Sequence, residues 1–295
     1  AEGYPDGSSA RCRLVDGLAT VTCAAAEVGQ GFVTLAQQIA RSVLGIDDVL
    51  LAPADTAIGS SGSTSASRQT WMSGGAVEKA CLAVREELLA HVGAEYGLDP
   101  KQLAITDGRI VSAAGEVDVA VGEAAPGVVF EQEVLFHHRL THPLDADGQG
   151  DAHVSLACAA HRAVVDVDPD LGLVRVVQIA TAQDVGKALN PMQVLGQIEG
   201  GIAQGLGLAT MEELTLRAGR IENASFTDYL IPTALDMPEV VATLIEEPEP
   251  GAPFGAKGVG EPPTISSTPA IVAALRAATG RPLTRVPVRP QDIAL

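Results

Sequence analysis

One carboxylate, Glu261, closes a segment that contains three glycines, residues 255–260, and two prolines follow it directly. Glycine allows the backbone to approach a ligand closely and to adopt positive φ angles. A proline restricts the residue before it, so Pro262 predicts an extended backbone at Glu261. A carboxylate held in this way is suited to act as a general base at one fixed point. The same pattern is also typical of a surface turn, so other segments have to decide between the two.

Three further segments combine glycines with polar side chains. Gln30 lies between Gly29 and Gly31, so its amide either reaches a ligand oxygen or faces water. Residues 59–75 are rich in Ser, Thr and Gly and lead into a helix, a combination that binds anions or forms a flexible loop. Residues 191–208 hold five glycines around Gln197, and each glycine costs a helix about 1 kcal/mol relative to alanine. Close backbone packing or the close approach of a flat ligand would offset this cost.

In their order and content, these four segments resemble the molybdenum-binding part of the xanthine dehydrogenase and aldehyde oxidase family of molybdenum hydroxylases. The resemblance rests on Gly-Gln-Gly at 29–31, Thr-Ser-Ala-Ser at 64–67, Gly-Gln-Ile-Glu-Gly at 196–200 and Val-Gly-Glu-Pro-Pro at 259–263. It extends from the Asp16-Gly17 turn to about Arg289. The family's earlier Gly-Gly-x-Phe-Gly-Gly motif is absent from this sequence. The resemblance therefore implies the C-terminal half of a molybdopterin-binding subunit that hydroxylates a purine or a related N-heterocycle.

The resemblance assigns roles to individual residues. It implies that Glu261 is the general base, that Gln30 hydrogen-bonds an oxo ligand of molybdenum, and that Gln197 contacts the pterin. Cofactor contacts are implied for the remaining motif residues, which are Gly29, Gly31, Ala66, Ser67, Arg68, Gln69, Gly258, Val259 and Gly260. Arg68 replaces a smaller residue of the animal enzymes and either meets a phosphate with two hydrogen bonds or faces solvent. No protein side chain is expected to bind the metal, because the family holds molybdenum through the pterin dithiolene.

Cofactors and partners follow from the same resemblance. It implies molybdopterin, in its cytosine dinucleotide form, with molybdenum. Iron–sulfur clusters and FAD would lie on other domains or subunits, and the N-terminal half of the molybdenum subunit would complete the site. A small-molecule substrate is expected, a homo-oligomer is compatible with the resemblance, and the chain alone is expected to be inactive.

Composition narrows the class of protein. The 295 residues carry a net charge of −18, and no basic stripe is available to neutralise the phosphates of a nucleic acid. No run of 18 apolar residues occurs, so a membrane span is not expected. The cysteines at 12, 23, 81 and 158 are too far apart for an iron–sulfur or zinc site and suit a reducing cytoplasm. A cytoplasmic location is therefore predicted.

Hydrophobic periodicity predicts an α+β fold in two lobes of mixed sheet packed with helices, over residues 1–135 and 136–295, with the Glu261 loop in the second. In the first lobe we expect a hairpin at 11–24, helices at 32–44 and 76–96, a strand at 49–52 and a hairpin at 103–113. Residues 114–151 have no clear period and are expected to cross between the lobes. In the second lobe we expect a hairpin at 153–181, a helix at 191–208, strands at 213–217, 220–222 and 240–245, and a helix at 269–279. Thr268 followed by Pro269 is the predicted start of that last helix.

Three alternatives stay open at this point. The first is an aldehyde oxidase-type hydroxylase subunit, and the second is a binding module of the same fold without the cofactor. The third is an unrelated acid/base hydrolase in which Glu261 works with a second carboxylate, Glu199 or Asp184. Molybdenum and pterin analysis of the full-length subunit would separate the molybdenum-containing classes from the others.

Overall fold

The computed structural model describes residues 6–294, which form two compact units of mixed α and β structure. Unit 1 comprises the chain up to Leu156 together with Pro248–Gly258, and unit 2 comprises Ala157–Glu247 and the chain from Val259 onward. The chain therefore passes between the units three times. The expected boundary at 135/136 falls inside a strand of unit 1, and the units divide 21 residues later, after Leu156.

Unit 1 is built on a four-stranded sheet with the order β3-β2-β1-β7. The strands are β1 (Gly7–Val15), β2 (Leu18–Cys23), β3 (Val49–Leu51) and β7 (Phe130–His137). The predicted hairpin is confirmed, because Asp16 and Gly17 take the positive φ angles of 47° and 82° that its tight turn needs. The sheet buries alternate side chains such as Cys12 and Leu14 on one face.

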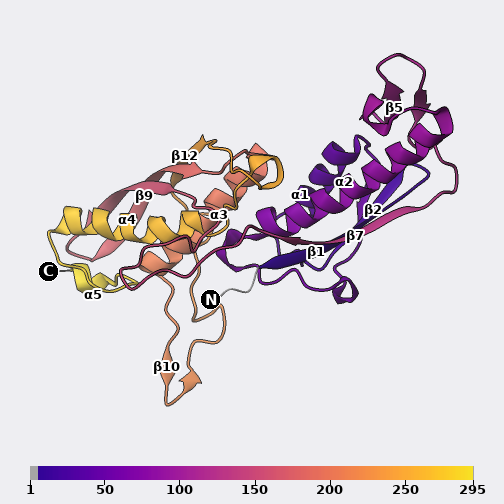
Figure 1. Ribbon diagram of the computed structural model, residues 1–295. Coiled ribbons are helices and arrows are strands. Elements are labelled where there is room, and N and C mark those ends of the chain that lie inside the picture. The colour runs from indigo at the N-terminus through magenta and orange to yellow at the C-terminus, as the bar shows by residue number, and fades with distance from the viewer. Residues whose placement is uncertain (1–5, 295) are drawn as a thin grey trace. The chain divides into compact units, whose positions relative to one another are not determined.

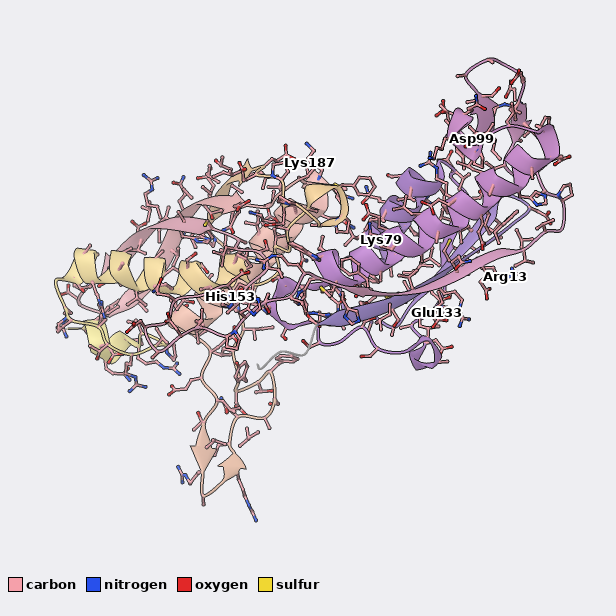
Figure 2. All side chains as sticks on the ribbon, in the orientation of Figure 1. Arg13, Lys79, Asp99, Glu133, His153 and Lys187 are labelled. Carbon is pink, nitrogen blue, oxygen red and sulfur yellow. The ribbon has the colours of Figure 1, made fainter. Side chains whose placement is uncertain are left out.

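Helices α1 (Phe32–Leu44) and α2 (Gln69–Tyr96) cover that buried face (Figure 1). The other face carries cross-strand ion pairs such as Arg11 with Glu133, and Figure 2 shows Arg13 and Glu133 on this side, away from Lys79 of α2. Helix α1 ends as predicted, since Gly45 adopts a left-handed conformation and its N–H bonds the carbonyl of Arg41.

The prediction that α2 begins near Ala76 is wrong, because the helix starts seven residues earlier at Gln69. Gly74 and Gly75 suggested a loop but lie inside the helix. A Cβ on Gly75 would come within 2.8 Å of the Phe136 ring, and one on Gly74 within 3.1 Å of Ile39. The two glycines therefore let α2 pack closely against β7 and α1.

A small antiparallel sheet, with short turns around it, extends unit 1. Its strands are β4 (Leu103–Thr106), β5 (Arg109–Ser112) and β6 (Asp118–Ala120), and the 3₁₀ turns are η1 (Thr56–Ile58), η2 (Ser65–Ser67), η3 (Pro100–Gln102) and η4 (Pro253–Gly255). The first two strands confirm the predicted hairpin at 103–113. The expectation of a crossing segment at 114–151 is wrong for β6 and β7, which belong to the sheets of unit 1.

Unit 2 packs helices against a three-stranded sheet with the order β12-β9-β8. Its elements are β8 (Ala159–Asp168), β9 (Leu173–Asp184), α3 (Pro191–Thr210), β10 (Leu216–Arg217), β11 (Arg220–Ile221), β12 (Glu239–Ile245), α4 (Pro262–Thr279) and α5 (Pro290–Ile293). Strand β12 runs parallel to β9, and β8 runs antiparallel to it. The core between sheet and helices is aliphatic and includes Val176, Ile179, Ile198, Ile202, Leu206, Ile271 and Leu275.

The predicted start of the last helix at Thr268 is wrong, since α4 begins at Pro262. Pro262 and Pro263 occupy the first helical positions, where a missing N–H costs nothing. Pro269 lies inside the helix and has no N–H to donate to the carbonyl of Ile265. Ile265 is 71% exposed, so water can bond that carbonyl instead. Within residues 6–294 the helices are too short or too polar to span a bilayer.

Candidate functional site

The Gly-Gln-Gly segment forms the turn that leads into α1. Gly29 and Gly31 have φ angles of 100° and 85°, which favour glycine, and Gly31 is the residue before the helix. The Glu27 carboxylate accepts hydrogen bonds from the N–H groups of Gly29 (2.7 Å), Gly31 (3.1 Å) and Val33 (3.0 Å). Burial alone would raise the pKa of Glu27, but these bonds outweigh it and hold the pKa below its ordinary value. Glu27 thus fixes the turn as a carboxylate at a helix N-terminus.

The amide of Gln30 is turned onto its own loop. Its Oε1 accepts the N–H of Val28 at 2.6 Å, and its Nε2 donates to the carbonyl of Ala26 at 2.8 Å. A glutamine amide has a second N–H and a second acceptor position, so these two bonds orient the group without using all its capacity. The predicted ligand contact of Gln30 stays a prediction.

The serine-rich loop before α2 contains two strained residues. Ala66 and Ser67 have φ angles of 61° and 48°, a left-handed conformation that costs a non-glycine residue on the order of 1–3 kcal/mol. Such strain persists only where surrounding contacts impose it, and it is concentrated at functional sites.

Arg68 supplies much of that constraint. Its Nε and Nη2 donate to the Asp6 carboxylate at 2.5 and 2.7 Å. Its other N–H groups donate to the carbonyls of Ser61, Ser63 and Gly7 at 2.5, 2.6 and 3.1 Å. Because all five donors of the guanidinium have protein acceptors, the side chain holds the loop. The cofactor contact predicted for Arg68 is untested and would fall to its backbone.

Gln69 also points into unit 1. Its Nε2 donates to the carbonyl of Ser63 at 3.1 Å, and its Oε1 accepts the hydroxyl of Ser73, which lies 3.0 Å from the hydroxyl of Ser8. Ser8 and Ser73 are fully buried, so the chain of hydrogen bonds connects the loop to the core beneath it. The side chain of Gln69 positions the loop, and its cofactor contact likewise remains a prediction.

The structure brings Gly258 into direct contact with this strained loop. A Cβ on Gly258 would lie 1.7 Å from the carbonyl oxygen of Ser67, so no other residue fits there without movement. The two segments are almost two hundred residues apart in the sequence. Unit 1 therefore contains, on one body, the Gly29–Gly31 turn, the residues 66–69 and Gly258.

Unit 2 holds the remaining predicted residues, which are Gln197, Val259, Gly260 and Glu261. Glu261 precedes the first turn of α4, and its carbonyl accepts the N–H groups of Thr264 and Ile265. Its φ and ψ of −95° and −32° are helical, so the predicted extended backbone at Glu261 is wrong. The reason is that α4 begins at Pro262, and Glu261 takes part in its first turn. Its side chain is half-buried.

Three of the five glycines of α3 have no room for a Cβ, and the other two do. A Cβ on Gly207 would lie 1.9 Å from the Glu212 carboxylate. A Cβ on Gly201 would lie 2.8 Å from Pro263, and one on Gly205 would lie 1.9 Å from the Ser267 hydroxyl, so these glycines allow α3 and α4 to pack closely. A Cβ on Gly196 or Gly200 would meet nothing within 4 Å. Packing thus explains Gly201, Gly205 and Gly207, whereas Gly196 and Gly200 leave open backbone one residue before and three residues after Gln197.

Two residues that sequence reasoning did not assign belong to this description. Glu27 lies two residues before the Gly-Gln-Gly segment, and a carboxylate shortly before a helix is a recognisable signal for a helix start. Trp71 carries a buried Nε1 that has no hydrogen-bond partner among the described residues. A buried donor of this kind calls for an acceptor, and no signal in the sequence marked it.

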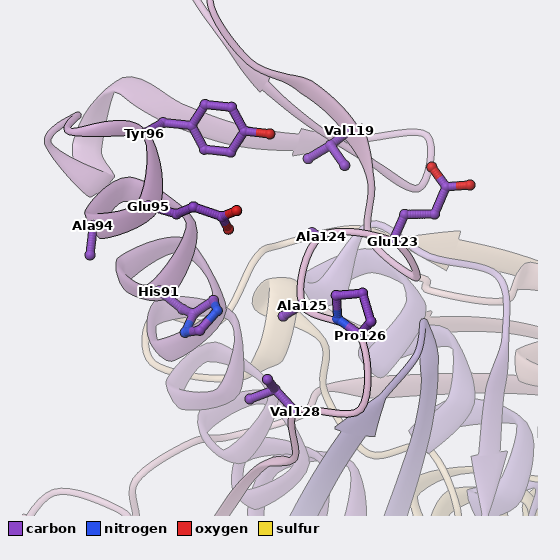
Figure 3. A pocket seen from close by; sticks show the side chains of 10 residues that line it. All are labelled: His91, Ala94, Glu95, Tyr96, Val119, Glu123, Ala124, Ala125, Pro126 and Val128. Carbon is purple, nitrogen blue, oxygen red and sulfur yellow. The ribbon is translucent and has the colours of Figure 1, made fainter.

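An open pocket of about 730 Å³ lies elsewhere in unit 1, beside the C-terminal half of α2 (Figure 3). Its polar side chains are those of His91, Glu95, Tyr96 and Glu123, and alanine, valine and proline line the rest. None of the predicted site residues lines it. The loop contacts described above, and not this pocket, therefore define the candidate site.

The residues present fit a large flat ligand with many hydrogen-bond acceptors. In unit 1 the open backbone at Gly29 permits close approach, and Trp71 supplies a buried donor without a partner among the described residues. In unit 2, considered by itself, Gly196 and Gly200 leave open backbone beside Gln197. The strained turn at Ala66 and Ser67 lies directly before α2, where backbone N–H groups favour anions.

Comparison with known proteins decides the family. The model of the molybdopterin cofactor-binding domain matches residues 2–238. The chain belongs to this family. The chain is 28% identical, over 94% of its length, to a putative xanthine dehydrogenase molybdenum-binding subunit of Escherichia coli K12, of which it covers 37%. The chain is also 31% identical to subunit gamma of the 6-hydroxypseudooxynicotine dehydrogenase complex of Paenarthrobacter nicotinovorans. That alignment covers 94% of the chain and 36% of the subunit.

The fold comparison agrees. The domain aligns with quinoline 2-oxidoreductase from Pseudomonas putida 86 with a TM-score of 0.82 and 29% identity, over 97% of this chain and 38% of that one. The predicted family and the α+β fold are therefore confirmed. The chain spans little more than a third of the length of these relatives, which are named as dehydrogenase or oxidoreductase proteins or their subunits.

Proposed function

We propose that this chain forms the part of a molybdenum hydroxylase that grips molybdopterin and carries the general base, Glu261. The contact of Gly258 with Ser67 carries the proposal. It joins two segments to which the family resemblance assigns cofactor contacts, and Gly258 lies three residues before Glu261. A base attached so closely to a cofactor loop has few conformations to search.

The chain's own residues supply orientation and one proton acceptor. The backbones of Gly29, Gly31 and residues 66–69 in unit 1 would hold the cofactor, and the Gln30 amide would offer it the N–H and acceptor position that its own loop leaves unused. A pterin contact of Gln197 is part of the proposal through the family resemblance. The Glu261 carboxylate accepts a proton during hydroxylation of the substrate. When bound, the molybdenum cofactor supplies the activated oxygen and accepts the electrons.

The finer features of the proposal concern substrate and partners. A purine or related N-heterocycle is the proposed substrate class, supported by the relatives named for xanthine and quinoline. The cytosine dinucleotide form of the cofactor, iron–sulfur and FAD subunits, and a further part of the molybdenum subunit complete the proposed assembly. The relatives' greater length supports the last of these.

The decisive experiment compares Glu261→Gln with Glu199→Gln in the assembled enzyme, with molybdenum and pterin measured beside turnover. Loss of a general base costs about 10²–10⁴ in rate, so kcat of Glu261→Gln should fall at least a hundredfold with unchanged molybdenum. Glu199 is exposed on α3, and its variant should retain activity. A Glu261→Gln enzyme with more than a tenth of wild-type activity would refute the assignment. Loss of activity in both variants of a molybdenum-free protein would favour the acid/base hydrolase.

A further inference from the structure

A largely buried cluster of three side chains joins the segments that leave unit 1. Lys257 Nζ donates to the carbonyl of Leu156 at 3.1 Å and lies 3.9 Å from Glu249 Oε2. The Ser155 hydroxyl donates to the same Glu249 oxygen at 2.5 Å. We call Ser155, Glu249 and Lys257 the crossing cluster. All three lie in unit 1.

The position of the cluster along the chain is its main feature. The chain passes between the units after Leu156, after Glu247 and after Gly258. Each member of the cluster lies within two residues of a different crossing. The hydrogen bonds therefore fasten the three crossing segments to one another on the unit 1 side.

Burial separates this ion pair from the others. The side chains of Lys257 and Glu249 are 8% and 15% exposed, whereas those of Lys187 and Glu246, another lysine–glutamate pair, are 52% and 41% exposed. Burying two charges costs several kcal/mol, and their attraction offsets this only where geometry is good. A buried pair is thus weak support for stability, and its best-attested use is to fix one arrangement among several.

The arrangement fixed here is that of the segment leading to Glu261. Residues 248–258 form a compact turn in which Glu249, Ala252, Gly255 and Ala256 donate backbone hydrogen bonds within the segment. The turn lies on α2, since a Cβ on Gly74 would come 3.5 Å from Pro253. Lys257 and Gly258 then hold its end against Leu156 and Ser67 before the chain continues to Glu261.

We infer that Lys257 and Glu249 are positioning residues for the proposed reaction, which fix the point at which the base-bearing loop leaves the cofactor-binding unit. The inference rests on the proposed function. The two side chains act through the loop, without contact to substrate or cofactor. Their removal should loosen the loop and misplace Glu261, while substrate affinity and metal content persist.

The test uses Lys257→Met and its conservative partner Lys257→Arg in the assembled enzyme. Hydrogen–deuterium exchange measures the opening of the loop through the hydrogen-bonded amides of residues 249–256. Steady-state kinetics and metal analysis measure turnover, KM and the molybdenum content. In Lys257→Met these amides should exchange about tenfold faster, because local opening limits their protection. We expect kcat to fall about tenfold, with KM and molybdenum changed less than about twofold. Lys257→Arg should restore both readouts.

Lys187→Met is the matched control, because it removes the same charge from an exposed pair whose glutamate lies next to the 247/248 crossing. It should leave exchange and kcat at wild-type values. If Lys257→Met does not fold, Glu249→Gln takes its place and should increase exchange of the same amides about threefold, since the Ser155 bond survives.

Wild-type exchange of residues 249–256 in Lys257→Met would overturn the inference. Loss of molybdenum with unchanged exchange would also overturn it, because Lys257 would then contact the cofactor. The exchange experiment requires no turnover. A wild-type enzyme without molybdenum would therefore refute the proposed function and leave the test of the crossing cluster intact.

Discussion

Replacing Gly258 by alanine should destabilise unit 1 through a single methyl group. The new Cβ would lie 1.7 Å from the Ser67 carbonyl oxygen and 2.7 Å from its carbonyl carbon. Since carbon and oxygen normally approach no closer than about 3.3 Å, the two backbones must separate by about 1.5 Å. Ser67 cannot yield cheaply, because its left-handed turn is already strained and the Arg68 hydrogen bonds hold the loop. Overpacking of this kind costs roughly 1–3 kcal/mol, and we expect the upper end.

The assay is calorimetric unfolding of the purified protein, in which each kcal/mol corresponds to about 2–4 °C for a domain of this size. Gly258→Ala should therefore lower Tm by roughly 6–12 °C. Gly196→Ala is the matched control. Its methyl group meets nothing within 4 Å on α3, so the change should stabilise the helix by up to about 1 kcal/mol. Equal Tm values for Gly258→Ala and wild type would show that the two loops do not touch.

Further predictions concern packing, the loop anchor and pH. Gly205→Val should unfold unit 2 or lower its stability by more than about 2 kcal/mol, whereas Gly200→Val should leave the melting profile within about 1 kcal/mol of wild type. Arg68→Met should cost about 2 kcal/mol in urea unfolding, against less than about 0.5 kcal/mol for Arg109→Met, whose ion pair is exposed. Burial lowers the pKa of His161 below the ordinary value of 6.5, so the unfolded state binds the proton more tightly than the folded state. The free energy of unfolding should therefore be unaffected by His161 above pH 6.5 and should fall as the pH drops below it. His161→Gln should weaken this pH dependence in urea titrations.

Elements defined by neighbouring residues were predictable from the sequence. The Asp16-Gly17 hairpin and the end of α1 at Gly45 depend on local backbone conformations that few residues besides glycine adopt. Strand β7 was missed because its partner is β1, more than a hundred residues earlier, and no local pattern encodes such pairing. The start of α2 was missed because Gly74 and Gly75 suggest a loop until the Phe136 ring that needs their space is known.

The candidate site divides in the same way. The glycine-rich segments and Glu261 could be named as candidates from the sequence, since they are motifs of residue type and spacing. The hydrogen bonds of Arg68 could not be predicted from the sequence, because its partner Asp6 is 62 residues away. The orientation of the Gln30 amide depends on the backbone of Ala26 and Val28, which residue types do not specify. The helical conformation of Glu261 required the true start of α4.

The interleaving of the two units has a consequence for biosynthesis. Pro248–Gly258 belongs to unit 1, yet the ribosome produces it about one hundred residues after Leu156. At typical elongation rates of about 5–20 residues per second, the rest of unit 1 waits several seconds or longer for its last segment. During that interval the N-terminal part of α2 lacks the turn that will lie on it, while unit 2 is emerging. The turn that leads to Glu261 therefore reaches its place on α2 only after most of the chain has been made.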